Sequence, residues 1–136
     1  MAQPRINVDP RVPDTAPILI VCESGSDSEQ LKTAFREAGL TSERVNDFTS
    51  GCKSVKSNRF QVVFSAPLLE GRSWTCLIDT AGQNELGFEV VLVARTFDLY
   101  QWAEALQVGA FDVLDVLCDL PKAAEAAKRA LWGQLI

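Results

Sequence analysis

The feature that most constrains this chain is a repeated alternation between short apolar runs and segments whose apolar residues recur at helical spacing. The runs at residues 18–21 and 90–93 are continuously apolar, which is typical of strands that a parallel sheet buries on both faces. A third run, residues 61–65, is apolar except at its ends. Because alternating strands and helices with short connections form a parallel sheet covered by helices, the pattern predicts an α/β fold.

The remaining segments complete five strand–helix units. Residues 43–46 are polar and predict an edge strand, and residues 112–116 predict the fifth strand. The first expected helix ends near Gly39, and the second covers residues 50–57. The third follows a break at residues 70–73, the fourth ends at Gly109, and the fifth covers residues 121–135. Five units in about 120 residues predict a flavodoxin-like (βα)5 three-layer sandwich with a parallel sheet of order 2-1-3-4-5. Residues 1–16, with three prolines, are expected to form an extended arm outside a domain spanning residues 17–136.

Composition excludes several classes of function. Apolar residues make up 47% of the 136 residues, enough for a real core, and the net charge is −5. An acidic chain without a basic stripe is a poor partner for nucleic acid or for an anionic membrane surface. The absence of histidine excludes histidine-dependent metal sites and catalytic bases. No segment has the apolar pattern of a signal peptide or a membrane span, so we expect a cytoplasmic protein.

The four cysteines form no Cys-x-x-Cys pair, and Cys22 and Cys118 lie in or beside apolar runs. Free cysteines in such places behave as small apolar residues. We therefore expect reduced thiols, with a disulfide as the less favoured alternative.

A sheet of this order binds ligands beyond the carboxyl ends of its strands, where the first and third strands lie side by side. A phosphoryl-accepting site there needs a carboxylate nucleophile, further acids for Mg²⁺, and a hydroxyl and a cation near the transferred group. The residues expected at this edge are Cys22, Glu23, Ala66, Ala94 and Val116. Only Glu23 is an acid, so we expect no catalytic residue, no cofactor and no metal, with Glu23 as a weak candidate cation ligand. Glu70 is a remote alternative as a substitute acceptor.

From residue 17 to residue 135 the chain resembles the receiver domain of bacterial two-component response regulators. The most specific match is Gly-Ala-Phe-Asp-Val-Leu at residues 109–114, which is similar to the family's Gly-Ala-x-Asp-Tyr-Leu run. Residues 17–23 resemble the first strand, where the family has two adjacent acids and this chain has Cys22 and Glu23. Residues 60–71 resemble the third strand and its loop, with the loop proline displaced to Pro67.

The resemblance places the family's functional positions on residues that cannot perform their roles. The phosphoacceptor aspartate falls on Ala66, and the Ser or Thr of the fourth strand falls on Ala94. The lysine of the fifth strand falls on Val116, with Leu117 in place of the following proline. The switch aromatic falls on Val113. The resemblance therefore implies a pseudo-receiver, in which the scaffold is kept and the phosphorylation switch is removed.

Such a scaffold is expected to act in signal transduction as a phosphorylation-independent protein–protein interaction module and not as an enzyme. Its partner is expected to be a signalling protein or a second copy of the chain. Two alternatives remain open: an atypical receiver that binds a small molecule, and a phosphorelay receiver with an unconventional acceptor.

The tryptophans differ in their expected surroundings. Trp74 and Trp102 share helical stripes with apolar neighbours and are expected to lie mostly in the core. Trp132 lies on a partly polar face of the last helix and is a candidate interface anchor, with Tyr100 and Gln101 as candidate neighbours. The resemblance places the interface on the fourth helix, fifth strand and fifth helix, through which receivers commonly associate.

Overall fold

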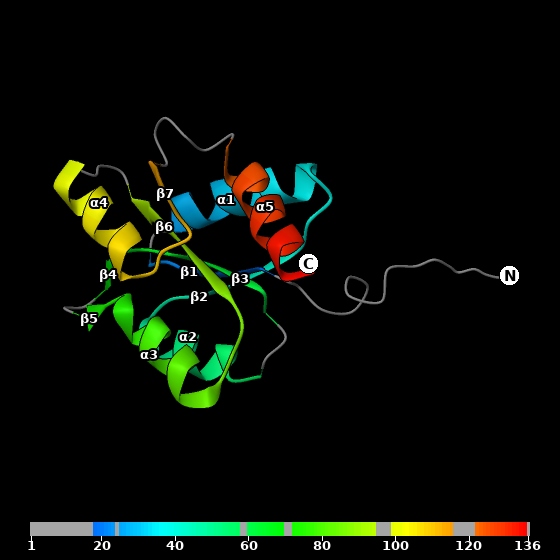
Figure 1. The fold of residues 1–136 in the computed structure, drawn as a ribbon. Coiled ribbons are helices and arrows are strands. Elements are labelled where there is room, and N and C mark those ends of the chain that lie inside the picture. Colours follow the sequence, from blue (N-terminus) through cyan, green and yellow to red (C-terminus); the bar gives the residue numbers. More distant parts are fainter. Residues whose placement is uncertain are drawn as a thin grey trace, which may run out of the picture.

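The structure, a computed structural model, describes residues 18–23, 25–57, 60–69, 72–94, 99–115 and 122–135. Its main sheet has five parallel strands in the order β2-β1-β3-β6-β7 (Figure 1). Since β6 and β7 are the fourth and fifth strands of this sheet along the chain, the predicted order 2-1-3-4-5 is confirmed. The strands of the sheet are β1 (Ile18–Val21), β2 (Ser42–Val45), β3 (Val62–Ser65), β6 (Glu89–Ala94) and β7 (Asp112–Asp115).

Five helices lie in the described ranges: α1 (Gly25–Glu37), α2 (Phe48–Val55), α3 (Thr75–Asn84), α4 (Leu99–Val108) and α5 (Ala123–Leu135). None of them, within those ranges, has both the length and the apolar character that crossing a membrane requires. The arm predicted for residues 1–16 lies outside the described residues.

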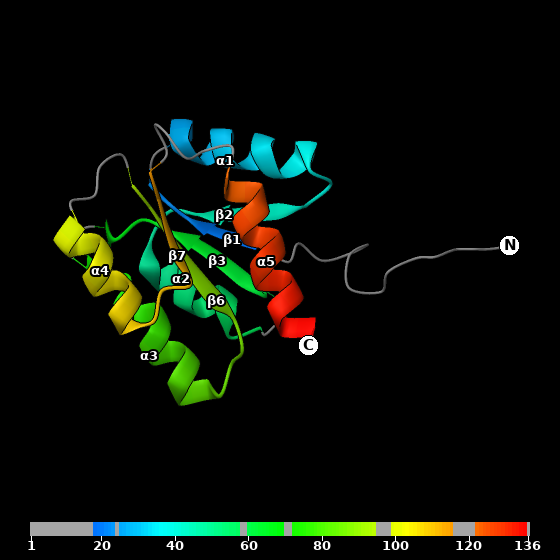
Figure 2. The ribbon, with the colours of Figure 1, turned by 45° about the horizontal axis from the view of Figure 1, so that its top comes forward.

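Successive residues of each strand point to opposite faces of the sheet and pack into separate cores. In β1, Ile18 and Ile20 join the core that includes residues of α1 and α5. The alternate residues, Leu19 and Val21, join the core that includes residues of α2, α3 and α4. Figure 2 shows α1 and α5 on one side of the sheet and α2 and α3 on the other. The continuously apolar runs of the sequence are therefore strands buried on both faces, as predicted.

α2 begins two residues earlier than the sequence pattern predicts because Asp47 caps it. The Asp47 Oδ1 accepts a hydrogen bond of 2.7 Å from the backbone N–H of Ser50. This bond, followed by one from the Ser50 side chain, holds the pKa of Asp47 below its ordinary value. Farther along the helix, a Cβ on Gly51 would meet Val21 Cγ2 at 3.1 Å, so the glycine lets α2 lie close to β1.

Within the break predicted at residues 70–73, Arg72 and Ser73 form a short strand that the sequence pattern did not predict. β5 (Arg72–Ser73) pairs in antiparallel fashion with β4 (Leu68–Leu69). The backbone N–H of Trp74 donates to the Pro67 carbonyl at 3.0 Å and closes the base of this hairpin. Strands of two residues show no apolar period, which is why the pattern did not indicate them. The Trp74 side chain is buried, as predicted.

The prediction that Trp102 lies mostly in the core is wrong. The apolar spacing on which it rested does not mark the buried face of the helix. Among the described side chains of α4, only Ala105 is buried. Trp102 and Leu106 lie on one side of Ala105 around the helix, so the small residue and not the large ones faces the sheet. The exposed large apolar side chains of the described residues all lie on α4: Tyr100 (75%), Trp102 (41%), Leu106 (38%) and Val108 (46%).

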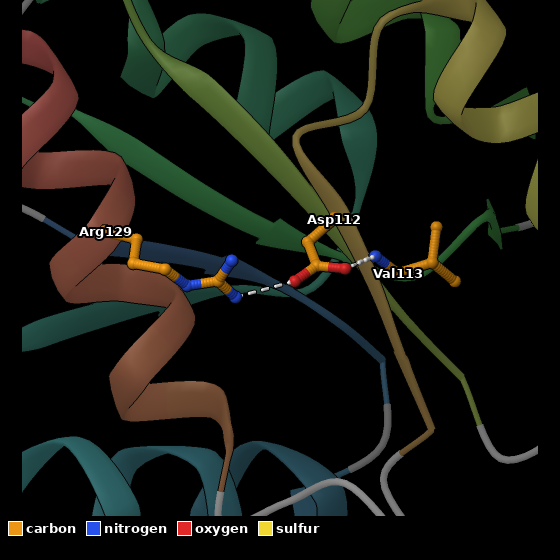
Figure 3. A network of polar contacts seen from close by, with 3 residues as sticks. All are labelled: Asp112, Val113 and Arg129. Atoms are coloured by element: carbon orange, nitrogen blue, oxygen red, sulfur yellow. Dashed lines mark hydrogen bonds and ion pairs between the residues drawn. The ribbon is translucent and has the colours of Figure 1, made fainter.

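The start of β7 is tied to α5 by Asp112 (Figure 3). Its Oδ2 accepts a hydrogen bond of 3.0 Å from Arg129, and its Oδ1 accepts one of 2.8 Å from the backbone N–H of Val113. The Arg129 guanidinium also lies 5.9 Å from the centre of the Phe111 ring. The aspartate of the Gly-Ala-Phe-Asp run thus has a structural role at the end of the sheet opposite the expected site.

Candidate functional site

The carboxyl ends of β1, β3 and β6 lie side by side at one end of the sheet, which we call the carboxyl edge. Val21 pairs with Ser65, and Ser65 pairs with Leu92, so the strands end at nearly the same level. The backbone N–H of Ala66 continues the ladder beyond β3 by donating to the Val21 carbonyl at 2.9 Å. The structure therefore brings to this edge four of the five predicted site residues, namely Cys22, Glu23, Ala66 and Ala94. Val116, Leu117 and Glu70 lie outside the described residues.

At the end of β1, the two positions expected from the sequence face different surroundings. Cys22 is buried in the core that it shares with α1 and α5, whereas Glu23 is exposed. Arg44, on the edge strand β2, donates from Nε to the Cys22 carbonyl at 3.2 Å and from a terminal nitrogen to the Glu23 carbonyl at 2.9 Å. A guanidinium thus holds the backbone of this strand end and adds a positive charge beside it.

At the end of β3, no nucleophile faces the edge in the described structure. Ala66 is half-buried and packs against the core beneath α2 and α3. The preceding Ser65 is fully buried, and its hydroxyl donates a hydrogen bond of 2.7 Å to the Ala66 carbonyl. If the family's phosphoacceptor position fell on Ser65 and not on Ala66, it would offer only a hydroxyl that is already buried and hydrogen-bonded.

At the end of β6, Ala94 pairs with Asp115 of β7. Asp115 is thus a second acid at this end of the sheet, one position before the residue that the resemblance matches to the family's lysine. Val113, two residues earlier, is buried in the core beneath α2, α3 and α4. In the part of the chain that the structure describes, no three cysteine, aspartate or glutamate side chains gather closely enough to hold a metal ion.

The residues predicted to form an interface are only partly described. Tyr100 and Gln101 are exposed on α4, as an interface requires. Trp132 belongs to α5, but its side chain lies outside the described part of the chain. The residue that the prediction missed is Trp102, whose exposure follows from the burial of Ala105 and not from any apolar period.

Comparisons with known proteins identify the architecture. No protein-family profile matches this sequence, and no curated protein is similar to it by sequence. Among solved structures, the chain is similar to the signal receiver domain of an HD domain-containing protein from Pseudomonas fluorescens Pf-5, at 21% identity and a TM-score of 0.77, covering 96% of this chain and 94% of that one. It is also similar to the signal receiver domain of a signal transduction histidine kinase from Syntrophus aciditrophicus, at 26% identity and a TM-score of 0.73, covering 88% of this chain and 92% of that one.

A response regulator receiver domain protein from Clostridium thermocellum is similar in the same way, at 17% identity and a TM-score of 0.76, with 88% of this chain and 97% of that one covered. These three solved structures superpose on 88% to 96% of this chain, at TM-scores of 0.73 to 0.77. The strand order of the sheet, the Gly-Ala-x-Asp run at residues 109–112 and these superpositions all indicate the receiver architecture. The chain has the fold of a response-regulator receiver domain.

Proposed function

We propose that this chain is a degenerate receiver that acts in signal transduction through protein–protein contact, independently of phosphorylation and without catalysing a reaction. The chemistry of the carboxyl edge supports this. Ala66 offers a methyl group where a phosphoacceptor needs a carboxylate, and Ala94 offers no hydroxyl for the transferred group. The module is proposed to work in the cytoplasm, in keeping with its free thiols.

The electrostatics of the β1 end support the same proposal. Mg²⁺ requires several hard oxygen ligands, and the residue before Glu23 is a buried cysteine. Arg44 places a fixed positive charge on the two carbonyls of this strand end. Because like charges repel most strongly at short range, the guanidinium opposes the binding of a divalent cation there.

The single observation that carries the interaction role is the apolar surface of α4, formed by Tyr100, Trp102, Leu106 and Val108. All of the exposed large apolar side chains in the described structure belong to it. Trp102 and Leu106 lie on the same side of α4, with Tyr100 and Val108 on its other sides, and tryptophan and tyrosine are the residues that anchor interfaces most often. Trp102 and Leu106 are one helical turn apart and can enter a partner's surface together.

The partner that we propose is a second copy of this chain. Glu104 is the only charged residue of α4, so two copies can bring their α4 surfaces together with few opposing like charges. A twofold symmetric contact of this kind is the commonest arrangement of soluble oligomers. β7, at the end of the sheet next to α4, lies beside this surface and completes the proposed contact face.

The test is the concentration dependence of self-association, measured by sedimentation velocity for the chain and for Trp102→Gln. We expect the wild type to form a dimer and the variant to associate at least about tenfold more weakly, because an anchoring aromatic is lost. Thr33→Ala, on an exposed position of α1 across the sheet, is the matched control and should associate like the wild type. Trp132→Ala, studied beside them, tests the anchor predicted from the sequence.

Salt distinguishes the proposed partner from others. Two acidic copies that meet through apolar surfaces should associate equally well or better as the salt concentration rises, because salt screens their mutual repulsion. A wild type that stays monomeric at every concentration would contradict self-association. A dimer that Trp102→Gln leaves intact would contradict the α4 surface. Saturable binding of a small molecule at the carboxyl ends of the strands would favour the alternative of an atypical receiver that binds a small molecule.

A further inference from the structure

The thiols of Cys52 and Cys76 lie beside each other between α2 and α3. Their sulfur atoms are 3.7 Å apart, and Cys52 Sγ is also 3.7 Å from the Cys76 carbonyl oxygen. Both side chains are half-buried and both cysteines are free. They are 24 positions apart in the sequence, so no local spacing indicates the pair. The fold alone brings two thiols to a place from which a small reagent can reach them.

We infer that Cys52 and Cys76 form a dithiol site, which a low-molecular-weight disulfide such as oxidised glutathione converts reversibly into an intramolecular disulfide joining α2 to α3. This site is independent of the α4 surface and of the carboxyl edge. Cys22 does not take part, because it is buried in the core on the opposite face of the sheet.

The backbone around the two cysteines holds them in place. Gly51 lets α2 lie against β1, with Val21 at the distance of a tight contact, and Cys52 is the next residue. Cys76 lies in the first turn of α3, and its carbonyl also accepts a hydrogen bond of 2.9 Å from the Thr80 hydroxyl. A disulfide bond is about 2.05 Å long, so the sulfur atoms have to approach each other by roughly 1.7 Å. Rotation of the two side chains about their torsions supplies a movement of this size more cheaply than a shift of either helix.

The exchange proceeds in two balanced steps. One protein thiol loses its proton, and the thiolate attacks the small disulfide, forming a mixed disulfide and expelling one small thiolate. The second protein thiol then loses its proton and attacks the protein sulfur of the mixed disulfide, which expels the second small thiolate. The two protons from the protein end on the two released small thiols. The protein pair is oxidised by two electrons and the small disulfide is reduced by two.

The surroundings of the pair make this exchange slow at neutral pH. Burial, followed by the hydrogen bond with the Cys52 thiol, raises the pKa of Cys76 to about 11. Asp79 on the same helix raises the pKa further, while Arg72 of the β4–β5 hairpin lowers it. Only the thiolate reacts. At pH values below that pKa, a step that needs the Cys76 thiolate should therefore become about tenfold faster each time the pH is raised by one unit.

The experiment uses the full chain with Cys22→Ala and Cys118→Ser, so that the pair alone remains. The folded protein is incubated with oxidised glutathione, quenched with an alkylating reagent, and analysed by intact mass and by peptide mapping. We expect the loss of two hydrogen atoms, a cross-linked peptide containing Cys52 and Cys76, and full reversal by reduced glutathione. The disulfide closes a loop of the chain, so the thermal unfolding midpoint should rise by roughly 10 °C.

The single variants Cys52→Ser and Cys76→Ser should instead retain one glutathione per molecule, because no second thiol is available to displace it. Circular dichroism confirms that each is folded, and Cys52→Ala replaces Cys52→Ser if the latter is not. Glutathione attached separately to both cysteines of the folded pair variant would overturn the inference. So would no reaction in the folded state under conditions in which the urea-unfolded chain reacts.

Discussion

At the end of β3, the methyl group of Ala66 is only one of several side chains that differ from a phosphorylatable receiver. By the resemblance, Cys22 stands where the family has an acid at the end of β1, and Ala94 stands where it has a hydroxyl at the end of β6. Each of these groups acts on the same phosphoryl oxygens or on the same metal ion. Because the groups act together, their losses do not add as independent defects, and replacing one of them should restore little.

Restoring the aspartate alone, in Ala66→Asp, is therefore expected to leave the chain without phosphorylation. The new carboxylate would lie near Glu23 but without the acid that the family has at the Cys22 position, and Ala94 offers no hydroxyl to stabilise the transferred charge. The measurement is the intact mass after incubation with acetyl phosphate and Mg²⁺. Cys22→Asp combined with Ala66→Asp is the comparison, since it adds the acid that is missing beside Glu23. A stoichiometric phosphoryl group on the single variant would contradict the view that the whole site is lost.

Asp47 gives a prediction about acid stability. Its folded-state pKa lies below the ordinary 3.8 because the Ser50 N–H binds the charged carboxylate. A lowered pKa means that this contribution to the free energy of unfolding is fully present above pH 3.8 and is lost as the pH falls through the folded-state value. Asp47→Ala should be less stable than the wild type near neutral pH, as measured by urea unfolding.

Asp47→Asn is the matched variant, because an asparagine caps a helix without titrating. It should stay closer to the wild type in stability near neutral pH and lose less when the pH is lowered to about 3. If Asp47→Asn and the wild type responded identically to acid, the hydrogen bond from Ser50 would not be the cause of the lowered pKa.

Among the elements, α2 shows how one glycine sets a packing distance. Gly51→Ala brings a Cβ to 3.1 Å from Val21 Cγ2, a contact tighter than packed side chains normally accept. We expect it to lower the free energy of unfolding by about 1–3 kcal/mol, the range for overpacked cores. Gly82→Ala is the control in α3, where a Cβ meets no atom within 4 Å. It should raise stability by about 0.5–1 kcal/mol through helix propensity alone.

Urea unfolding of the two glycine variants checks this pair of expectations. A lower free energy of unfolding for Gly51→Ala together with a higher one for Gly82→Ala supports the packing argument, since helix propensity favours alanine at both positions. A gain in stability for Gly51→Ala as large as that for Gly82→Ala would show that α2 can move away from the sheet at no cost.

The elements that sequence predicted well are those whose surroundings impose one chemical type on every residue. β1 and β6 are buried on both faces, which leaves continuous apolar runs that need no knowledge of the fold. α4 was harder to interpret, because its spacing suggested a core stripe through Trp102 while the fold buries Ala105. The β4–β5 hairpin could not be predicted, because its strands are only two residues long.

The candidate site was predictable to the extent that it follows from the topology. Once the sheet order is known, the ends of β1, β3 and β6 must meet, and Cys22, Glu23 and Ala66 follow as neighbours. Three features needed the structure because they depend on tertiary contacts. Arg44 reaches across from the edge strand, Cys52 meets Cys76 between two helices, and Asp115 stands at the edge beside Ala94.

At the scale of the whole molecule, the chain has the three layers of the receiver fold, and we propose that the chemistry at the carboxyl ends of its strands is lost. The sheet order, the two separate cores and the ion pair between Asp112 and Arg129 hold the layers together. A receiver that switches needs a two-state element that phosphorylation biases, and the resemblance places the family's switch aromatic on Val113, which is buried in the core. We therefore expect one conformation, whose output depends on the surface of α4.

The most direct test of this account is the amide spectrum of the ¹⁵N-labelled chain, recorded with beryllofluoride and Mg²⁺, which together mimic an aspartyl phosphate. Assigned resonances of Glu23, Ala66 and α4 would be followed during the titration, with a phosphorylatable receiver treated in the same way as the positive control. We predict that none of these resonances shifts with saturation and that self-association stays unchanged. Saturable shifts at Glu23 and Ala66, transmitted to α4, would contradict the account.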